Sequence, residues 1–354
     1  MAPRISRTEA DGQSIYRFED PASALSGAVV VDSLALGPAT GGCRFWHYED
    51  EASLLADARR LARGMSYKNA MAGLPLGGGK SVIRRPAGPF DREALFSAFG
   101  QVLDALKGEY LAAEDVGTTT ADMAVARAQT PFVLGLPAHG EKAGGDPSPW
   151  TALGVFLCIE HVLARREIPL AGSRIAVQGL GNVGRDLCRR LHAAGARLVV
   201  ADVHADAVAR LLAEVPADVM APDAIHRAVA DLYAPCALGA GLNARTIPDM
   251  AAPLVAGAAN NQLETPEDGE RLQGRGILYV PDYVANAGGI INVAAEYLGD
   301  DALAVGERVG RIPARLAGVL DRAEASGTPP VRVADAMARE LIAAASLPSM
   351  RSAG

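Results

Sequence analysis

The sequence predicts an α/β protein of two domains, one of which is built on a parallel sheet. Three observations lead to this prediction. The chain has 354 residues, a length that favours two domains. Proline and glycine are concentrated between residues 136 and 149, as they are at domain junctions. After this stretch, strand-like and helix-like segments alternate, which is the pattern of a parallel sheet covered by helices.

The junction divides the chain into a first domain at 1–138 and a second at 139–330. A C-terminal helix, at about 331–354, is expected to pack back on the first domain. We expect a cleft between the two domains. Such a cleft would bring together the candidate chemical groups of the first domain and the candidate cofactor site of the second.

The composition is that of a globular protein, with 49% hydrophobic and 21% charged residues. The chain has 34 basic and 41 acidic residues without a basic block, so we expect neither nucleic acid nor an anionic membrane as a partner. No apolar run is long enough to span a bilayer, and the N-terminus has no signal core. The four cysteines form no Cys-x-x-Cys pair, which predicts buried thiols in a reducing cytoplasm, without disulfides or a metal site.

The most informative stretch contains two lysines, Lys68 and Lys80, with four glycines between them. Three of these glycines, at 77–79, directly precede Lys80 and predict a loop that needs close backbone approach. The apolar residues around the lysines are expected to bury the ammonium groups, and burial lowers a lysine pKa until the amine can act as a base. A phosphate loop is excluded, because its spacing requires glycine where this chain has Leu74.

A candidate acid follows a strand-like run that begins at Tyr110. Glu114 and Asp115 lie at the end of this run and just before Gly117. Asp115 alone could be a capping residue. Together with the two lysines it indicates chemistry on an amine, which needs a carboxylate to move protons and a lysine to polarise a carbonyl or a water.

The remaining elements of the first domain follow from hydrophobic spacing and capping residues. We expect a strand at 28–31, a loop with paired glycines at 36–44, a helix at 51–65, a strand at 81–83 and a helix after Asp91.

The second domain begins with a helix at about 149–165 and then a dinucleotide-binding pattern. A strand at 173–178 leads into a glycine turn, a helix, a second strand at 197–201 and Asp202. The acid would bind the ribose hydroxyls and repel a 2′-phosphate, so the pattern favours NAD over NADP. We assign the pyrophosphate turn to Gly179, Gly181, Asn182, Val183 and Gly184.

Three further strand-like runs lie near 231–233, 254–257 and 276–280. Because ligands bind at the carboxyl ends of parallel strands, the polar residues that follow should face the nicotinamide. Asn261 and Asn286 are the candidates, although an asparagine at such a place is often a turn former. We expect helices over 292–325, with breaks, and over 333–345.

Seven motifs between Ser33 and Ala344 resemble one family. They are Gly37-Pro-Ala-Thr-Gly-Gly-Cys-Arg44, Met65-Ser-Tyr-Lys-Asn-Ala70, Gly73-Leu-Pro-Leu-Gly-Gly-Gly-Lys80, Ala113-Glu-Asp-Val-Gly-Thr-Thr119, Gly145-Asp-Pro-Ser-Pro149, Gly257-Ala-Ala-Asn-Asn-Gln-Leu263 and Pro281-Asp-Tyr-Val-Ala-Asn-Ala-Gly-Gly289. The chain is similar to the glutamate/leucine/phenylalanine/valine dehydrogenase superfamily, and to leucine dehydrogenases in particular. Asp146 departs from the asparagine that is usual in leucine dehydrogenases.

The resemblance implies reversible oxidative deamination of an L-amino acid to a 2-oxo acid and ammonia, with NAD as cofactor. It implies a homo-oligomer, from a dimer to an octamer. Lys68 resembles the lysine that holds the substrate carboxylate, Lys80 the lysine that activates water, and Asp115 the proton-transferring acid. The backbone of Gly41 and Gly42 would lie near the substrate. Thr151 and Asn261 are similar to residues that orient the nicotinamide.

The resemblance also bears on the substrate. Glutamate-specific relatives have a lysine where this chain has Thr40, and without that cation a γ-carboxylate would be buried unpaired. We expect an apolar pocket for leucine or another branched-chain amino acid, with phenylalanine as the alternative. Leucine dehydrogenases mostly have leucine at position 40. The expected pocket residues are Met65, Ala113, Ile290 and Val293.

Two other classes fit less well. A hydroxy-acid dehydrogenase usually needs a histidine and an arginine, and no His/acid pair accompanies Arg44 or Arg63. An NAD-binding sensor without activity would not need Lys68, Lys80 and Asp115 together.

Overall fold

The computed structural model describes residues 2–137, 143–237 and 239–346. The chain divides into two compact units. Unit one comprises Met1–Gly145, Val293–Asp301 and Ala338–Gly354, and unit two comprises Asp146–Asn292 and Ala302–Met337. The predicted boundary between 138 and 139 lies outside the described residues, and the division falls at Gly145. The chain passes between the units again at three later points, at 292/293, 301/302 and 337/338.

Unit one contains a six-stranded mixed sheet with the order β1-β2-β3-β5-β4-β6. Its strands are β1 Arg4–Ala10, β2 Gln13–Asp20, β3 Leu25–Ser33, β4 Ala39–Trp46, β5 Gly77–Arg84 and β6 Tyr110–Glu114. The first three strands and β5 pair antiparallel, whereas β4 is parallel to both β5 and β6. Parallel pairing makes β4, β5 and β6 end at the same edge of the sheet.

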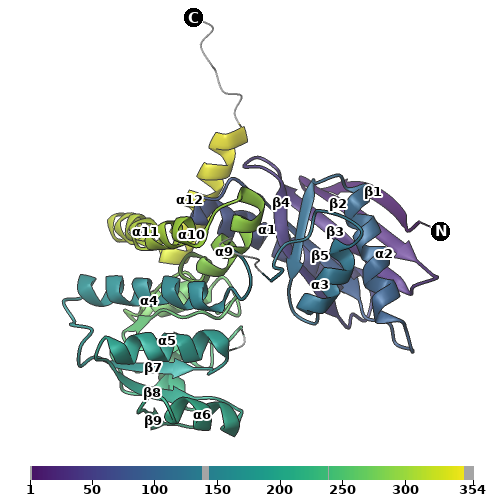
Figure 1. Cartoon of the computed structure of the whole chain (residues 1–354). Helices are drawn as coiled ribbons and strands as arrows, with labels where there is room; N and C mark the ends of the chain where they lie inside the picture. The colour runs from purple at the N-terminus through teal and green to yellow at the C-terminus, as the bar shows by residue number, and fades with distance from the viewer. Residues whose placement is uncertain (1, 138–142, 238, 347–354) are drawn as a thin grey trace, which may run out of the picture. The chain divides into compact units, whose positions relative to one another are not determined.

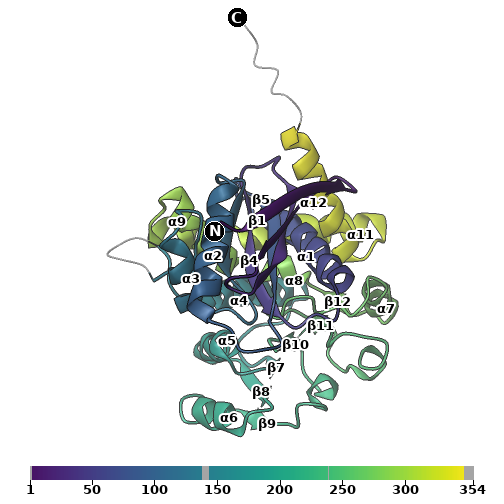
Figure 2. The same ribbon diagram turned by 90° about the vertical axis from the view of Figure 1, so that its right-hand side faces the viewer.

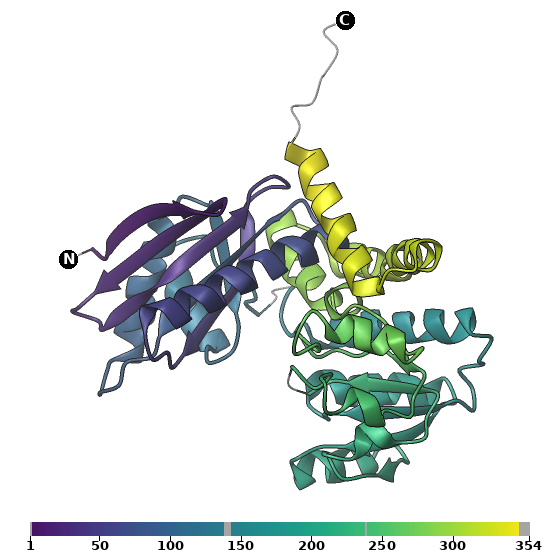
Figure 3. The same ribbon diagram turned by 180° about the vertical axis from the view of Figure 1, so that it is seen from behind.

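Helices cover both faces of this sheet. They are α1 Glu51–Ala72, α2 Arg92–Ala105 and α3 Thr120–Arg127. Figure 1 shows α2 and α3 over one face, and Figure 3 shows α1 over the other. The α2 and α3 side buries an aromatic core that includes Phe45, Phe96 and Phe99. The α1 side buries a smaller aliphatic core that includes Leu54 and Val82.

Gly41, Gly42 and the glycines at 77–79 lie in strands, so the prediction of loops at 36–44 and 77–79 was wrong in part. β4 begins at Ala39 and β5 at Gly77. A Cβ atom on Gly41 would lie 1.9 Å from the carbonyl oxygen of Gly79, and one on Gly78 would lie 2.0 Å from the amide nitrogen of Ser66. These glycines therefore serve close packing of strands and helix.

The helix predicted at 51–65 is longer than expected. It starts after a capping box at Asp50 and continues through Lys68 to Ala72. It ends at Gly73, whose φ of +69° places it in the left-handed region. The predicted cap at Asp91 is confirmed, because its side chain accepts a hydrogen bond from the amide of Ala94.

Unit two contains a six-stranded sheet with the order β12-β11-β10-β7-β8-β9, and all its pairs are parallel. Figure 2 shows the strand labels in this order. The strands are β7 Arg174–Gln178, β8 Arg197–Ala201, β9 Asp218–Val219, β10 Leu232–Pro235, β11 Leu254–Val255 and β12 Leu278–Tyr279. The order reverses between β7 and β10, which is the switch point where a doubly wound sheet binds ligands. The predicted α/β fold with a Rossmann-type domain is confirmed.

The helices predicted at 149–165, after the glycine turn and at 333–345 are present, and the segment at 292–325 breaks as expected, whereas three further helices, at 205–212, 268–274 and 282–285, were not predicted. The helices of the second half are α4 Ser148–Arg165, α5 Asn182–Ala193, α6 Ala205–Leu212, α7 Asp268–Gly274, α8 Asp282–Ala285, α9 Gly288–Leu298, α10 Ala302–Gly310, α11 Ile312–Ser326 and α12 Pro330–Ser346. The part of α12 in unit one contacts α1, where Arg339 donates a hydrogen bond to the hydroxyl of Tyr67. Within the described ranges, no helix is both long and apolar enough to cross a membrane.

Candidate active site

The predicted lysine and acid of unit one form an ion pair. Lys80 lies in the middle of β5 and Asp115 directly follows β6, and 2.7 Å separate Nζ from Oδ2. Strand β4 lies between them in the sheet. Gly42 on β4 makes the contact possible, because a Cβ atom there would lie 2.6 Å from Cβ of Asp115. The Lys80 side chain is only 5% exposed, so the pair is largely shielded from water.

A second cation, Arg44, contacts the same carboxylate oxygen. Its Nε lies 3.2 Å from Oδ2 of Asp115, and its Nη1 lies 2.9 Å from Oδ2 of Asp57 on α1. Asp57 also accepts a hydrogen bond from the hydroxyl of Tyr48. Arg44 belongs to one of the sequence motifs, but its spacing there predicted no role for it. Its position two residues after Gly42 on the same strand was the available signal.

Burial and charge shift the ionisation of the pair in opposite ways. Desolvation lowers the pKa of Lys80, the repulsion from Arg44 lowers it further, and Asp115 opposes both. Burial by itself would raise the pKa of Asp115, but the attraction of Lys80 and Arg44 outweighs it and the pKa lies below its ordinary value. Asp115 is therefore held as a carboxylate, and at a given pH a larger fraction of Lys80 is neutral and available as a base than of an exposed lysine.

Tight packing of α1 on β5 positions the predicted substrate residues Lys68 and Met65. The side-chain amide of Asn69 donates to the carbonyl oxygen of Gly77 over 2.6 Å. Met65 Cγ lies 3.3 Å from where a Cβ atom on Gly41 would be. Lys68 follows Met65 by three residues, so the two lie on the same side of α1.

Two hydroxyl groups fix the backbone around the pair. The hydroxyl of Tyr110 donates to the carbonyl oxygen of Gly41 over 2.7 Å and accepts from the amide of Ser81. The hydroxyl of Thr118 accepts from the amide of Asp115 over 2.9 Å and donates to the carbonyl oxygen of Cys43. Both the glycine strand and the Asp115 loop are thereby held in place.

The residues predicted to line the side-chain pocket are distributed over four elements, including α1, which carries Met65. Thr40 on β4 is fully buried, and its hydroxyl has no hydrogen-bond partner among the described residues. Ala113 on β6 pairs with Gly42. Ile290 and Val293 lie three residues apart on one side of α9, with Ile290 in unit two and Val293 in unit one.

The glycine turn of unit two lies between β7 and α5, and each of its glycines is required for a different structural reason. Gly179 has a φ of +94°, which a residue with a side chain rarely adopts. A Cβ atom on Gly184 would lie 1.9 Å from the carbonyl oxygen of Gly179. Gly181 meets no atom within 4 Å, so it leaves open space at the N-terminus of α5. Amide groups at this helix start, including those of Asn182 and Val183, have no intrahelical partner and can bind an anion.

Asp202 follows β8 and is tied to this turn. Its Oδ2 accepts a hydrogen bond from the backbone amide of Leu180 over 2.6 Å, and its Oδ1 accepts one from the backbone amide of His204 over 2.8 Å. The side chain is half-buried, and each oxygen keeps a lone pair for a further donor. The arrangement fits the two hydroxyls of a ribose.

The predicted nicotinamide residues lie after β11 and β12 and at the start of α4. Asn286 donates to the carbonyl oxygen of Ala258 and to the side chain of Asn260, while its buried Oδ1 has no partner among the described residues. Asn261 has a φ of +52° in the neighbouring turn. The hydroxyl of Thr151 bonds to the carbonyl oxygen of Pro147. These polar groups fit the carboxamide of a nicotinamide.

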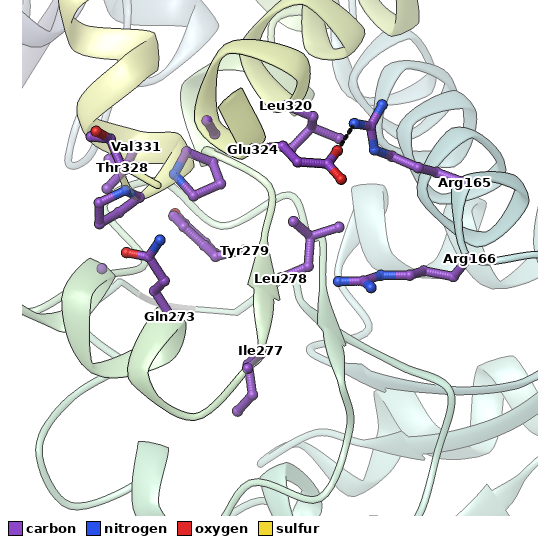
Figure 4. Close-up of a pocket in the computed structure, with 15 residues that line it drawn as sticks. Arg165, Arg166, Gln273, Ile277, Leu278, Tyr279, Leu320, Glu324, Thr328 and Val331 are labelled. Carbon is purple, nitrogen blue, oxygen red and sulfur yellow. Dashed lines mark hydrogen bonds and ion pairs between the residues drawn. The ribbon is translucent and has the colours of Figure 1, made fainter. Parts of the chain in front are cut away.

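Unit two also contains a pocket of about 440 Å³ that is separate from these residues. Figure 4 shows it beside the ion pair of Arg165 and Glu324, with Leu278 and Leu320 among its walls. Arg165 ends α4, whereas Thr151 lies in its first turn. The two ends of this helix are roughly 20 Å apart. The pocket is therefore not part of the cofactor turn.

Comparison with known proteins identifies the family. The model of the Glu/Leu/Phe/Val dehydrogenase dimerisation domain matches residues 15–131, and the model of glutamate/leucine/phenylalanine/valine dehydrogenase matches residues 146–208 and 200–308. Leucine dehydrogenase of Bacillus subtilis (strain 168) is 44% identical over 94% of this chain and 92% of its own length.

Two further relatives agree. Valine dehydrogenase of Streptomyces albus is 42% identical over 94% of this chain and 93% of its own. The crystal structure of L-tryptophan dehydrogenase from Nostoc punctiforme matches with a TM-score of 0.83 and 36% identity, covering 96% of both chains. The chain therefore belongs to the glutamate/leucine/phenylalanine/valine dehydrogenase family and is an amino-acid dehydrogenase.

Proposed function

We propose that the chain catalyses NAD-dependent oxidative deamination of an apolar L-amino acid to its 2-oxo acid and ammonia. The observation that carries this proposal is the buried contact between Lys80 and Asp115. In the reaction, the substrate loses a hydride from its α-carbon and a proton from its amino group. Water then converts the imino acid to the 2-oxo acid. When bound, NAD supplies the acceptor for the hydride.

The residues of unit one divide the proton chemistry. Lys80, with its lowered pKa, takes a proton from the water that attacks the imino carbon, and as a cation it stabilises the oxygen that becomes negative. Asp115 exchanges protons with the nitrogen. Lys68 pairs with the substrate carboxylate, and the backbone of Gly41 and Gly42 lies beside it.

NAD is proposed as the cofactor in preference to NADP because of Asp202. Its carboxylate can accept hydrogen bonds from both ribose hydroxyls but would repel a 2′-phosphate. The open space at Gly181 suits the pyrophosphate, and the buried Oδ1 of Asn286 suits the amide of the nicotinamide, with Thr151 and Asn261 orienting the ring.

The proposed substrates are leucine and other branched-chain amino acids. Thr40 is buried and neutral, so a glutamate γ-carboxylate at that position would lack a cation. The other pocket residues are Met65, Ala113, Ile290 and Val293, all apolar. Phenylalanine is the alternative within the family, because pocket size alone separates such side chains by only about 1–3 kcal/mol.

We also propose a cytoplasmic homo-oligomer of two to eight subunits. The match of unit one to a dimerisation domain supports self-association, and four free cysteines support a reducing compartment. Light scattering that gave a monomer at micromolar concentration would contradict the first part. Recovery of the native protein from a secreted fraction would contradict the second.

A single assay tests the proposed reaction. NAD or NADP reduction is followed at 340 nm with L-leucine, L-valine, L-phenylalanine, L-tryptophan and L-glutamate. We expect the highest kcat/KM with NAD and a branched-chain substrate. Preference for glutamate or for NADP would overturn the corresponding part of the proposal.

A further inference from the structure

The two oxygens of the Asp115 carboxylate differ in their contacts. Its Oδ2 accepts hydrogen bonds from both Lys80, over 2.7 Å, and Arg44, over 3.2 Å. Its Oδ1 has no hydrogen-bond partner among the residues that the structure describes. One oxygen is thus fixed by two cations, and the other remains able to accept a proton.

Arg44 itself is fixed from its other side. Its Nη1 contacts Asp57, whose Oδ2 also accepts the hydroxyl of Tyr48. The guanidinium therefore bridges two carboxylates on different elements, the planar fork geometry for which arginine is suited and lysine is not. The Arg44 side chain is 19% exposed, so water screens these contacts only in part.

We propose that Arg44 is a positioning residue that holds Oδ2 of Asp115, together with Lys80, so that Oδ1 exchanges the proton with the substrate nitrogen. In the transfer, an N–H bond of the substrate breaks and an O–H bond forms at Oδ1, while the electron pair stays on nitrogen. The reverse transfer returns the proton to the departing ammonia. This inference rests on the proposed function and adds a residue to it.

Arg44 has a second, electrostatic effect because it lies beside Lys80. The charged and titratable groups that act on Lys80 are Asp115 after β6 and, on β4, Arg44 and the Cys43 thiol. From α1, Asp57 pairs with Arg44. Loss of the Arg44 cation removes a repulsion from the protonated amine, so the pKa of Lys80 rises. Because the neutral amine is the active base, the alkaline-rising limb of kcat/KM must then move to higher pH.

The test is the pH profile of kcat/KM for L-leucine in the wild type, Arg44→Gln, Arg44→Lys and Arg60→Gln. For Arg44→Gln we expect the limb to move up by about one pH unit and the rate to fall by about 10–100-fold. Arg44→Lys keeps the positive charge but loses the planar guanidinium that bridges the two carboxylates. The alkaline-rising limb of kcat/KM should therefore stay near its wild-type pH, while the rate remains reduced. Arg60→Gln is the matched control, because Arg60 contacts the same Asp57 over 2.8 Å without reaching Asp115.

The outcomes separate the two levels of the proposal. A wild-type protein without amino-acid-dependent NAD reduction would contradict the proposed function. An active wild type together with a folded Arg44→Gln variant whose limb has not moved would contradict the role of Arg44. Folding is checked by thermal unfolding and by NADH binding. If Arg44→Gln does not fold, Arg44→Lys decides, since wild-type turnover in that variant would overturn the positioning role.

Discussion

The two units build their candidate sites by different means. In unit one, the candidate site is formed by charged side chains: Asp115 accepts hydrogen bonds from the buried Lys80 and from the half-buried Arg44, and glycines make room for them. In unit two, the backbone forms most of the candidate site, through the open turn at Gly181 and the start of α5. The first arrangement suits proton transfer, and the second suits recognition of a dinucleotide.

The difference predicts separable defects. Changes in unit one should affect turnover and its pH dependence more than cofactor affinity, whereas changes in unit two should affect cofactor affinity more than turnover. Three variants test this division, and a fourth, with the smallest expected effect, tests the packing of unit one.

Replacing Lys80 by alanine should give the largest effect. It removes the proposed base, so kcat should fall by about 10²–10⁴, while substrate and NADH binding largely survive. Saturation kinetics and a fluorescence titration with NADH measure the two quantities. A variant with wild-type kcat and weakened NADH binding would reverse the assignment of the units.

Gly42→Ala tests whether glycine is needed for the position of the acid. The new Cβ would lie 2.6 Å from Cβ of Asp115 and 2.9 Å from the carbonyl oxygen of Glu114. A displacement of this carboxylate by about 1 Å should reduce kcat by about 10². Gly64→Ala on α1 is the control, because its Cβ meets no atom within 4 Å, and it should leave kcat unchanged. Equal rates in the two variants would contradict the packing argument.

Asp202→Ser should weaken NAD binding by about tenfold, because it removes a charge-assisted contact to the ribose. It should also narrow the preference for NAD over NADP and leave kcat at saturating cofactor nearly unchanged. The ratio of kcat/KM for the two cofactors is the measurement. An unchanged ratio would mean that selectivity depends on other residues.

Thr40→Val should have the smallest effect and should stabilise the protein. The Thr40 hydroxyl is buried without a partner in the described part of the chain, so its removal should gain about 1 kcal/mol. Thr118→Val is the control, because that hydroxyl accepts from Asp115 and donates to Cys43, and its loss should cost about 1–3 kcal/mol. Thermal unfolding compares the two, and destabilisation of equal size would show that Thr40 is hydrogen-bonded after all.

Most of the fold of unit two could be predicted from the sequence, although β9, α6, α7 and α8 were not expected. Apart from the exposed β9, its strands are short and largely buried. Gly179 has the positive φ that its place after a strand suggests. Local sequence and local structure agree here because a parallel sheet repeats one simple unit.

Unit one was harder to predict, because long-range packing decides its glycines. Gly41 and Gly78 look like loop residues, yet they lie in strands where neighbouring backbone leaves no room for a side chain. The sequence predicted Lys80 and Asp115 as functional residues. It could not predict that Arg44 contacts Asp115, since the two are 71 residues apart. The β1–β2 hairpin was also missed.

The most direct test of the account is the pH dependence of kcat/KM for L-leucine in the wild type and in Lys80→Ala. Burial and Arg44 lower the pKa of Lys80, so the wild-type rate should rise with pH as the amine loses its proton, below the range of an exposed lysine. Lys80→Ala should lose this limb together with most of the rate. An alkaline limb and a rate that both persist in Lys80→Ala would remove Lys80 from the chemistry and contradict the account.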